Sequence, residues 1–345
     1  MINTIEHFKY LEQKYDIPFE ELVTIDLNLS GVATNLNLDR VRFELHLDKK
    51  TLLFSVENNL LSAYNIKNDK LFFKDVYLCD VSNLQDDTCE VFYTRKNGKV
   101  LCFNPNNRSF CIGCRFCYQP MSNDKQNVST SMIKNAFESW LKQNDLKDLS
   151  HLEQVAVVTG CFESEQLTVD YLTKLREVLL SLDFTKEILF LGIISDIQNI
   201  ERLSQIKPLQ ICFTIECFEN RDFILRKRKS LELNRISELM KKSIEQGINT
   251  NFSYIVGLDS FDSFNENMLV LKNYINVFPI ISLFQTDKER IKYKHKEALN
   301  IEYYLNCRKY IEEIFRDTNL LPNSWNNYRS LWRTCYNDKS IIDDE

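Results

Sequence analysis

The chain has 345 residues, a formal net charge of -6 and a hydrophobic content of 44%. These values are those of an ordinary globular protein and exclude a disordered chain. The negative charge argues against a general polyanion-binding protein, so nucleic acid is not an expected partner, although the run RKRK at 226–229 is locally basic.

Targeting signals are not evident. No apolar run reaches the roughly 18 residues that a membrane-spanning helix needs. The N-terminal stretch MINTIEHFKYLEQKY lacks the apolar region of a signal peptide. We therefore expect a cytoplasmic protein with no membrane partner, in which the eleven cysteines are thiols or metal ligands and not disulfides.

The N-terminal third combines helical and strand patterns. Residues 1–20 have apolar side chains at helical spacing, and Pro18 is expected to end this helix. Short alternating runs follow from about 38 to 103, and Asn97-Gly98 between two of them predicts a hairpin. We predict that residues 1–95 form an α+β region that shapes substrate access or recognition.

Residues 111–120 read CIGCRFCYQP, with three cysteines spaced C-x2-C-x2-C. A structural zinc site needs four ligands, and the sequence has no second cysteine or histidine pair at ligand spacing. In the bacterial ferredoxin run C-x2-C-x2-C-x3-C-P, the fourth cysteine would stand at Met121. Either a remote cysteine completes the site, or one metal position stays open.

After this loop, short buried strands alternate with helices in about six βα units, which predicts a parallel sheet or a barrel. A strand at about 98–103 leads into the cysteine loop. The later strands are expected at 155–160, 187–194, 209–217, 249–257 and 279–285. The helices are expected at 132–143 (with Ser131 as its cap), 164–182, 197–203, 231–247 and 264–278.

Polar residues and glycines follow these strands at their carboxyl ends, where α/β barrels carry their reactive groups. The chain has only seven glycines, so each is expected where no other residue fits. Gly160 and Gly257 both fall at such strand ends.

The segment Cys114–Tyr118, between a first strand and βα repeats, resembles the cluster loop of the radical S-adenosylmethionine (SAM) superfamily. The resemblance implies that Cys111, Cys114 and Cys117 hold a [4Fe–4S] cluster whose fourth iron binds SAM. The usual family spacing is C-x3-C-x2-C, which would place the first cysteine at Phe110. Cys102 is therefore the reserve ligand.

The resemblance extends over about 98–285 and implies further site residues. Cys161 is the candidate catalytic thiol, as a hydrogen-atom donor or a link to the substrate; a small buried residue is the simpler interpretation. Glu216 and Arg221 resemble an acid–arginine pair that contacts SAM, or else form a local salt bridge. The residues expected to contact SAM are Tyr118, Thr159, Gly160, Glu163, Ser195 (or Asp196), Glu216, Arg221 and Gly257.

We thus expect an α/β protein with a partial (β/α)6 barrel of radical SAM type at 96–290, preceded by the strand-rich region and followed by a short helical extension at 291–345. The expected function is reductive cleavage of SAM and hydrogen abstraction from a small metabolite or from a peptide or protein side chain. Its expected partners are that substrate and an electron donor such as flavodoxin or ferredoxin. The alternative is a non-catalytic iron–sulfur or zinc-binding module.

Overall fold

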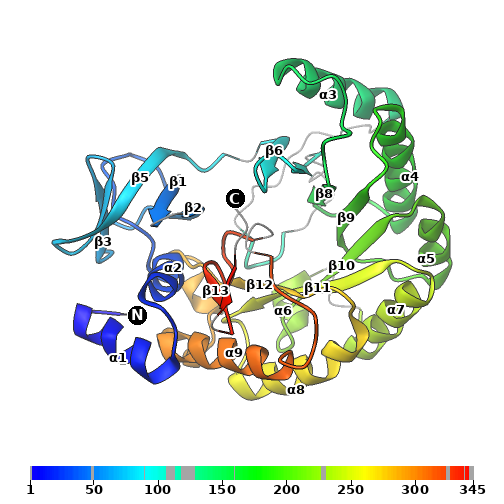
Figure 1. The fold of residues 1–345 in the computed structure, drawn as a ribbon. Helices are drawn as coiled ribbons and strands as arrows, with labels where there is room; N and C mark the ends of the chain where they lie inside the picture. Colours follow the sequence, from blue (N-terminus) through cyan, green and yellow to red (C-terminus); the bar gives the residue numbers. More distant parts are fainter. Residues whose placement is uncertain are drawn as a thin grey trace.

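The computed structural model describes residues 2–47, 50–88, 90–105, 113–117, 129–158, 160–226, 231–323, 327–337 and 339–341. Its main features are a five-stranded sheet near the N-terminus and a seven-stranded sheet that curves through the rest of the chain (Figure 1). None of the helices in these ranges is long and apolar enough to cross a membrane.

The N-terminal region begins with two helices, where the sequence predicts one. The first, α1 (Ile5–Tyr15), ends at Asp16, and the second, α2 (Phe19–Ser30), starts directly after Pro18. Helix α2 has no polar face, because even its Glu21, Asp26 and Asn28 are buried, and so it carries no amphipathic pattern. An antiparallel sheet follows in the order β2-β1-β5-β4-β3, with β1 (Arg40–Leu47), β2 (Lys50–Glu57), β3 (Tyr64–Lys67), β4 (Lys70–Phe73) and β5 (Val76–Asp86).

The predicted hairpin is confirmed. Strands β6 (Phe92–Arg95) and β7 (Val100–Phe103) pair antiparallel. The turn between them places Asn97 at φ 51° and Gly98 at φ 80°, a backbone conformation that Asn and Gly tolerate best. Strand β6 is thereby the edge strand of the seven-stranded sheet.

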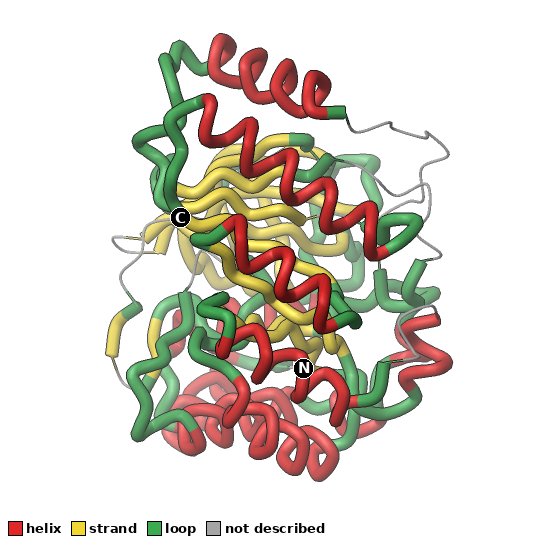
Figure 2. Tube along the Cα trace, turned by 90° about the vertical axis from the view of Figure 1, so that its right-hand side faces the viewer, coloured by secondary structure: helices red, strands yellow, loops and turns green. Residues whose placement is uncertain are grey.

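The seven-stranded sheet has the order β12-β11-β10-β9-β8-β7-β6, and β7 to β12 run parallel. The expected partial barrel is confirmed, with helices across the outer face of the sheet (Figures 1 and 2). The later strands are β8 (Gln154–Val158), β9 (Glu187–Gly192), β10 (Leu209–Glu216), β11 (Asn249–Val256) and β12 (Ile280–Leu283). The helices between them are α3 (Thr130–Gln143), α4 (Glu165–Ser181), α5 (Ile197–Leu203), α6 (Arg221–Leu225), α7 (Leu233–Glu245) and α8 (Phe261–Leu271).

Side chains alternate between the two faces of this sheet. On β10, Ile211 and Phe213 pack in the large core under the helices. Cys212, between them, packs on the opposite, inner face with Cys102 and Ala156 from β7 and β8. Because neighbouring strands share this alternation, apolar side chains from several strands meet at the centre of the inner face.

Two local expectations are wrong. Ser129, and not Ser131, caps α3, because its hydroxyl accepts the amide of Met132 and Ser131 already lies within the helix. Helix α8 ends at Leu271 and is followed by a short 3-10 turn at Lys272–Tyr274, so it is shorter than the apolar pattern suggests.

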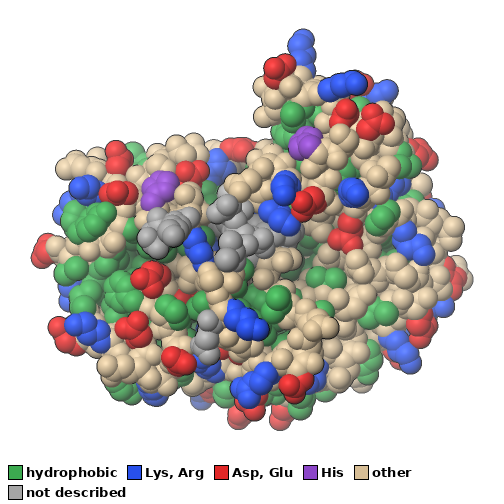
Figure 3. All heavy atoms as spheres, viewed as in Figure 1, with side chains coloured by type: hydrophobic (Ala, Val, Ile, Leu, Met, Phe, Trp, Pro, Cys, Tyr) green, Lys and Arg blue, Asp and Glu red, His purple; other side chains and the backbone are tan. Residues whose placement is uncertain are grey.

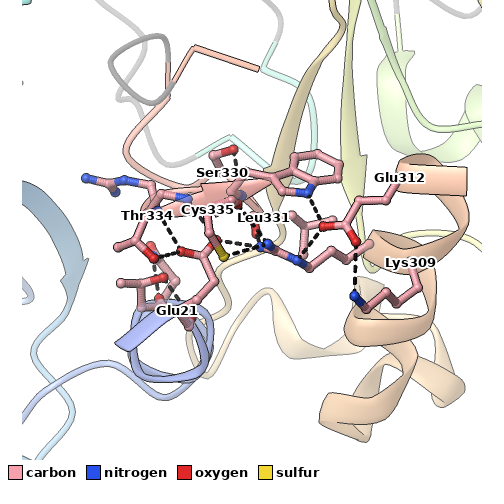
Figure 4. Close-up of polar contacts among 12 residues, drawn as sticks. Glu21, Lys309, Glu312, Ser330, Leu331, Thr334 and Cys335 are labelled. Atoms are coloured by element: carbon pink, nitrogen blue, oxygen red, sulfur yellow. Dashed lines mark hydrogen bonds and ion pairs between the residues drawn. The ribbon is translucent and has the colours of Figure 1, made fainter. Parts of the chain in front are cut away.

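The C-terminal extension is helical only in its first part. Helix α9 (Ile301–Ile314) is followed by the small hairpin β13 (Cys335–Tyr336) and β14 (Lys339–Ser340). Arg308 of α9 is 1% exposed and joins Glu21 of α2 to the backbone carbonyls of Leu331 and Cys335 (Figure 4). Through this buried network the extension and the N-terminal helices form one packed unit.

Residues 327–336, the seam segment, lie between the two edges of the open barrel. Ser330 forms an antiparallel bridge with Ser282 of β12, and the Leu283 amide donates to the carbonyl of Arg329 at 2.7 Å. At the other edge, the guanidinium of Arg95 on β6 lies 5.2 Å from the ring of Tyr328. The seam segment therefore connects β12 to β6.

Candidate functional site

The described part of the cysteine loop, residues 113–117, lies at the carboxyl-end rim of the barrel. The Arg115 amide donates to the carbonyl of Ile224 at 2.9 Å, and the Cys114 Sγ lies 3.6 Å from the carbonyl of Leu225. These contacts place the loop against α6, which follows β10. β7, the strand that precedes the loop in the chain, lies three strands away from β10 in the sheet.

The loop is also held from the segment that follows β12. The Arg290 Nη2 donates to the carbonyl of Cys117 at 3.2 Å, and the Arg115 Nη1 donates to the Tyr293 hydroxyl at 3.3 Å. Arg115 Nε donates in addition to the carbonyl of Phe223 at 2.8 Å. The guanidinium groups of Arg115 and Arg290 thus anchor the loop through backbone carbonyls and the Tyr293 hydroxyl, and not through the two thiols.

Cys114 and Cys117 share one turn, in which the Cys117 amide donates to the Cys114 carbonyl at 3.0 Å. Both are half-buried cysteines that form no disulfide within the described residues. The remaining candidates of this loop, Cys111 and Tyr118, lie outside the described residues. Within the described ranges, no three His, Cys, Asp or Glu residues are grouped to hold a metal ion.

The reserve ligand Cys102 lies within β7, away from the loop. It is 5% exposed and packs in the apolar cluster on the inner face of the sheet. Burial raises the pKa of its thiol, which disfavours the thiolate that a metal requires.

Glu216 occupies a strained turn at the carboxyl end of β10. The Cys217 amide donates to the Ile215 carbonyl at 2.9 Å across Glu216, whose φ is 68°. This is a γ-turn of the rare, strained kind, and it follows a register shift between β10 and β11. Arg221 Nη1 donates to the carbonyls of Ile215 (2.8 Å) and Cys217 and so holds both sides of the turn.

Arg221 therefore acts on backbone in this structure. Its Nη2 points to the Leu231 carbonyl at 3.4 Å, and burial lowers the pKa of the guanidinium. The sequence pairs Glu216 with Arg221 as SAM contacts, and that assignment stays a prediction; the structure shows Arg221 holding the turn in which Glu216 lies. Strained turns held from several sides are common at functional sites.

A second buried group, Asp259, holds the other end of the same turn. Its carboxylate accepts the amides of Phe218 (2.7 Å) and Glu219 (2.9 Å) and the hydroxyl of Tyr254 (2.7 Å). Asp259 is fully buried just beyond β11. The sequence assigns no role to it, although an acid two residues after the glycine that ends a strand was a usable signal.

Burial raises the pKa of Asp259 to about 6, although the Tyr254 hydroxyl and the two amides oppose this shift. Because the folded protein binds this proton more tightly than the unfolded chain, the free energy of unfolding should fall as pH rises from about 4 to about 6. The wild type should therefore lose about 3 kcal/mol relative to Asp259→Asn across this window. Urea denaturation of both proteins at several pH values measures this; a pH-independent difference would contradict it.

Gly257, at the end of β11, is required by its surroundings. Its φ is +117°, and a Cβ there would meet the Tyr304 hydroxyl at 2.8 Å and the Phe284 Cβ at 3.1 Å. The backbone at this strand end therefore packs more closely than any other residue would allow.

We expect Gly257→Ala to lower the free energy of unfolding by about 3 kcal/mol, from backbone strain and overpacking together. The buried Tyr304 hydroxyl has no hydrogen-bond partner among the residues that the structure describes. Tyr304→Phe alone should thus cost less than about 0.5 kcal/mol, and it should recover part of the loss in the double variant. Chemical denaturation gives both values, and full additivity of the two changes would refute the steric explanation.

The other expected residues line a cavity of about 260 Å³ at the carboxyl ends of β8 and β9. Gly160, Cys161, Glu163 and Ser195 all border it, and Thr159 lies outside the described residues. Cys161 and Glu163 thus border one hollow, about two strands away from the turn at Glu216.

Ser195 has its polar groups already engaged. Its amide donates to Glu165 Oε2 at 2.7 Å, its hydroxyl donates to the same oxygen, and the Asp196 amide donates to Oε1 at 3.0 Å. Glu165, which the sequence does not single out, thus fixes the start of α5 from the start of α4. This contact accounts for Ser195 without a ligand.

Fold and loop together define a partial α/β barrel with a thiol-bearing loop at the carboxyl rim. The sequence matches no protein-family model, and no curated protein is significantly similar to it. The structure is similar to Streptococcus suis SuiB bound to S-adenosylmethionine (TM-score 0.46, 16% identity, 65% of this chain and 51% of that chain). It is also similar to the FeFe-hydrogenase maturase HydG from Carboxydothermus hydrogenoformans (TM-score 0.45, 16% identity, 64% and 53%).

SuiB bound to its precursor peptide SuiA gives a further match, with a TM-score of 0.44 and 15% identity over 62% of this chain and 46% of that chain. The matched region is about half the length of each of these proteins. The similarity is one of fold alone.

Proposed function

We propose that this chain is a radical SAM enzyme that abstracts hydrogen from a small metabolite or from a peptide or protein side chain. The observation that carries the proposal is the position of Cys114 and Cys117, which share one turn over the carboxyl rim of a partial barrel. Two half-exposed thiols fixed by their backbone fit a cluster, since cysteine thiolates are the usual ligands of iron–sulfur centres.

In this proposal Cys111, Cys114 and Cys117 hold a [4Fe–4S] cluster. When bound with SAM, the cluster supplies the electron that cleaves SAM to a 5′-deoxyadenosyl radical. Arg115 and Arg290 keep the loop in place through its backbone and through Tyr293. Arg221 and Asp259 keep the turn at Glu216 in place at the carboxyl end of β10.

The remaining residues are assigned to SAM and substrate as proposals. The hollow at Gly160 and Glu163 would receive a cationic group, because no described residue pairs with the Glu163 carboxylate. Backbone at Gly257 would lie along the adenine, and Tyr118 and Thr159 would add SAM contacts. Ser195 is left out of this set, because Glu165 already engages its amide and hydroxyl. Cys161, which borders the same hollow, is the candidate for hydrogen-atom return to the substrate.

In this proposal, residues 1–95 shape substrate access or recognition, residues 96–290 contain the reaction site, and residues 291–345 pack against the barrel. Side chains of both signs are interspersed on the face seen in Figure 3. That face shows no continuous basic field of the kind that nucleic acid needs. The run 227–230 lies outside the described residues, which leaves Arg226 as the described basic residue of this run.

Anaerobic reconstitution tests the proposal. The purified protein is loaded with iron and sulfide, given dithionite and SAM, and assayed for 5′-deoxyadenosine by chromatography. Formation of 5′-deoxyadenosine supports the enzyme. A loaded cluster without this product indicates an electron-transfer module, and bound zinc without labile sulfide indicates a structural site.

A further inference from the structure

A group of apolar and basic side chains, exposed or half-buried, lies at the cysteine loop. We call it the basic–aromatic patch and define it as Arg115, Phe223, Ile291, Lys292 and Tyr293. Phe223 is 53% exposed and Ile291 is 43% exposed, and the two lie within one patch. The patch joins three segments, namely the loop itself, α6 and the short 3-10 helix at Ile291–Tyr293.

The cations of the patch are held by rings and carbonyls. The Arg115 guanidinium lies 4.2 Å from the Phe223 ring and 5.9 Å from the Tyr293 ring, and Lys292 Nζ lies 5.2 Å from the Tyr293 ring. Within the described ranges, no carboxylate forms an ion pair with Arg115 or Lys292. Their charges are therefore not neutralised locally.

We propose that the basic–aromatic patch is the docking surface for a small acidic one-electron donor protein. The inference rests on the proposed function, which needs an electron delivered to the site that Cys114 and Cys117 border. Arg115 lies between these two cysteines in the chain, so a protein seated on the patch reaches the loop directly. On docking, the donor loses one electron and the site gains it, with no atom transferred.

Charge and composition favour this occupant. The chain as a whole carries a net charge of -6 and would repel an acidic protein, so productive encounter needs a local basic surface. Arg and aromatic side chains are also the residues that most often dominate protein–protein contacts. Asp222 on α6 and Arg226, the residue after this helix, are both exposed and carry opposite charges, which leaves the excess of positive charge with Arg115 and Lys292.

The experiment compares two reductants on the reconstituted full chain. One arm uses dithionite, which needs no docking, and the other uses flavodoxin kept reduced by its reductase. The variants are Lys292→Glu, Ile291→Ala and the double variant. The matched controls are Lys241→Glu and Val270→Ala, which change an exposed cation and an exposed apolar residue on α7 and α8.

We expect the flavodoxin-driven rate of 5′-deoxyadenosine formation to fall about tenfold in the double variant. The dithionite-driven rate and the iron content should stay at the wild-type level, and the controls should change neither rate. The wild-type flavodoxin rate should also decrease as ionic strength rises from about 0.05 to about 0.3 M.

Equal flavodoxin rates in the double variant and the wild type would overturn the docking surface while the proposed function stands on the dithionite arm. A wild type that flavodoxin does not reduce would overturn it as well. If dithionite yields no product from a loaded cluster, the proposed function fails, and the docking inference fails with it. Phe223→Ala provides a further check on the docking surface. It removes the exposed ring of the patch and keeps the Phe223 carbonyl that accepts the Arg115 hydrogen bond.

Discussion

Cys114→Ala and Cys117→Ala should each abolish cluster binding. Both thiols belong to one turn at the rim, and no other described cysteine lies in this loop to replace either of them. Removing one of three thiolates leaves an iron without a protein ligand, and second-site compensation would require the rigid strands to move. Iron and labile sulfide after anaerobic reconstitution, together with the visible absorption of the cluster, measure the loss.

The controls separate ligand loss from misfolding. Cys102→Ala should keep the cluster, because Cys102 packs on the inner face of the sheet with Ala156 and Cys212. Cys212→Ala is the matched control, because it removes another buried thiol from the same apolar group. If Cys111→Ala retains the cluster and Cys102→Ala loses it, the first ligand is Cys102 and not Cys111.

The partial barrel was predictable because its strands are buried on both sides. Such strands appear as short apolar runs between amphipathic helices, and the six predicted parallel strands match β7 to β12 to within a few residues. Helix α2 was not predictable by the same rule. Its burial on all sides removes the periodicity, and its polar residues Glu21 and Asp26 are hydrogen-bonded mainly by residues far away in the sequence.

The candidate site was predictable where a residue type alone carries the chemistry, as with Cys114 and Cys117. It was less predictable where the role of a residue depends on which groups it contacts in the folded chain. Arg221 was assigned to a ligand, but its donors go to the carbonyls that flank Glu216, which only the turn geometry reveals. Asp259 and Glu165 hold loops through backbone amides, and such contacts leave no spacing pattern in the sequence.

Arg308→Met should lower the free energy of unfolding by about 3 to 5 kcal/mol, the cost of breaking a buried ion pair. Arg308 is 1% exposed, donates to Glu21 and ion-pairs with Glu312 at 2.9 Å. Its loss leaves two buried carboxylates, one of which also accepts the amides of Arg333 (2.8 Å) and Thr334 (2.6 Å). Urea denaturation of the apoprotein measures the change.

Lys309→Met is the matched control, because Lys309 also contacts Glu312, at 3.3 Å, from a side chain that is 36% exposed. It should cost less than about 1 kcal/mol, since solvent screens the exposed charge. In the double variant Glu21→Gln with Arg308→Met, the free energy of unfolding should fall by less than the sum of the two single losses. Each single change leaves the partner residue without the opposite charge that it pairs with in the wild type. In Arg308→Met, hydrogen exchange should quicken first in the seam segment, residues 327–336, which Arg308 and Glu21 tie to the rest of the fold. Equal losses in Arg308→Met and Lys309→Met would mean that the buried network does not hold this segment against β12.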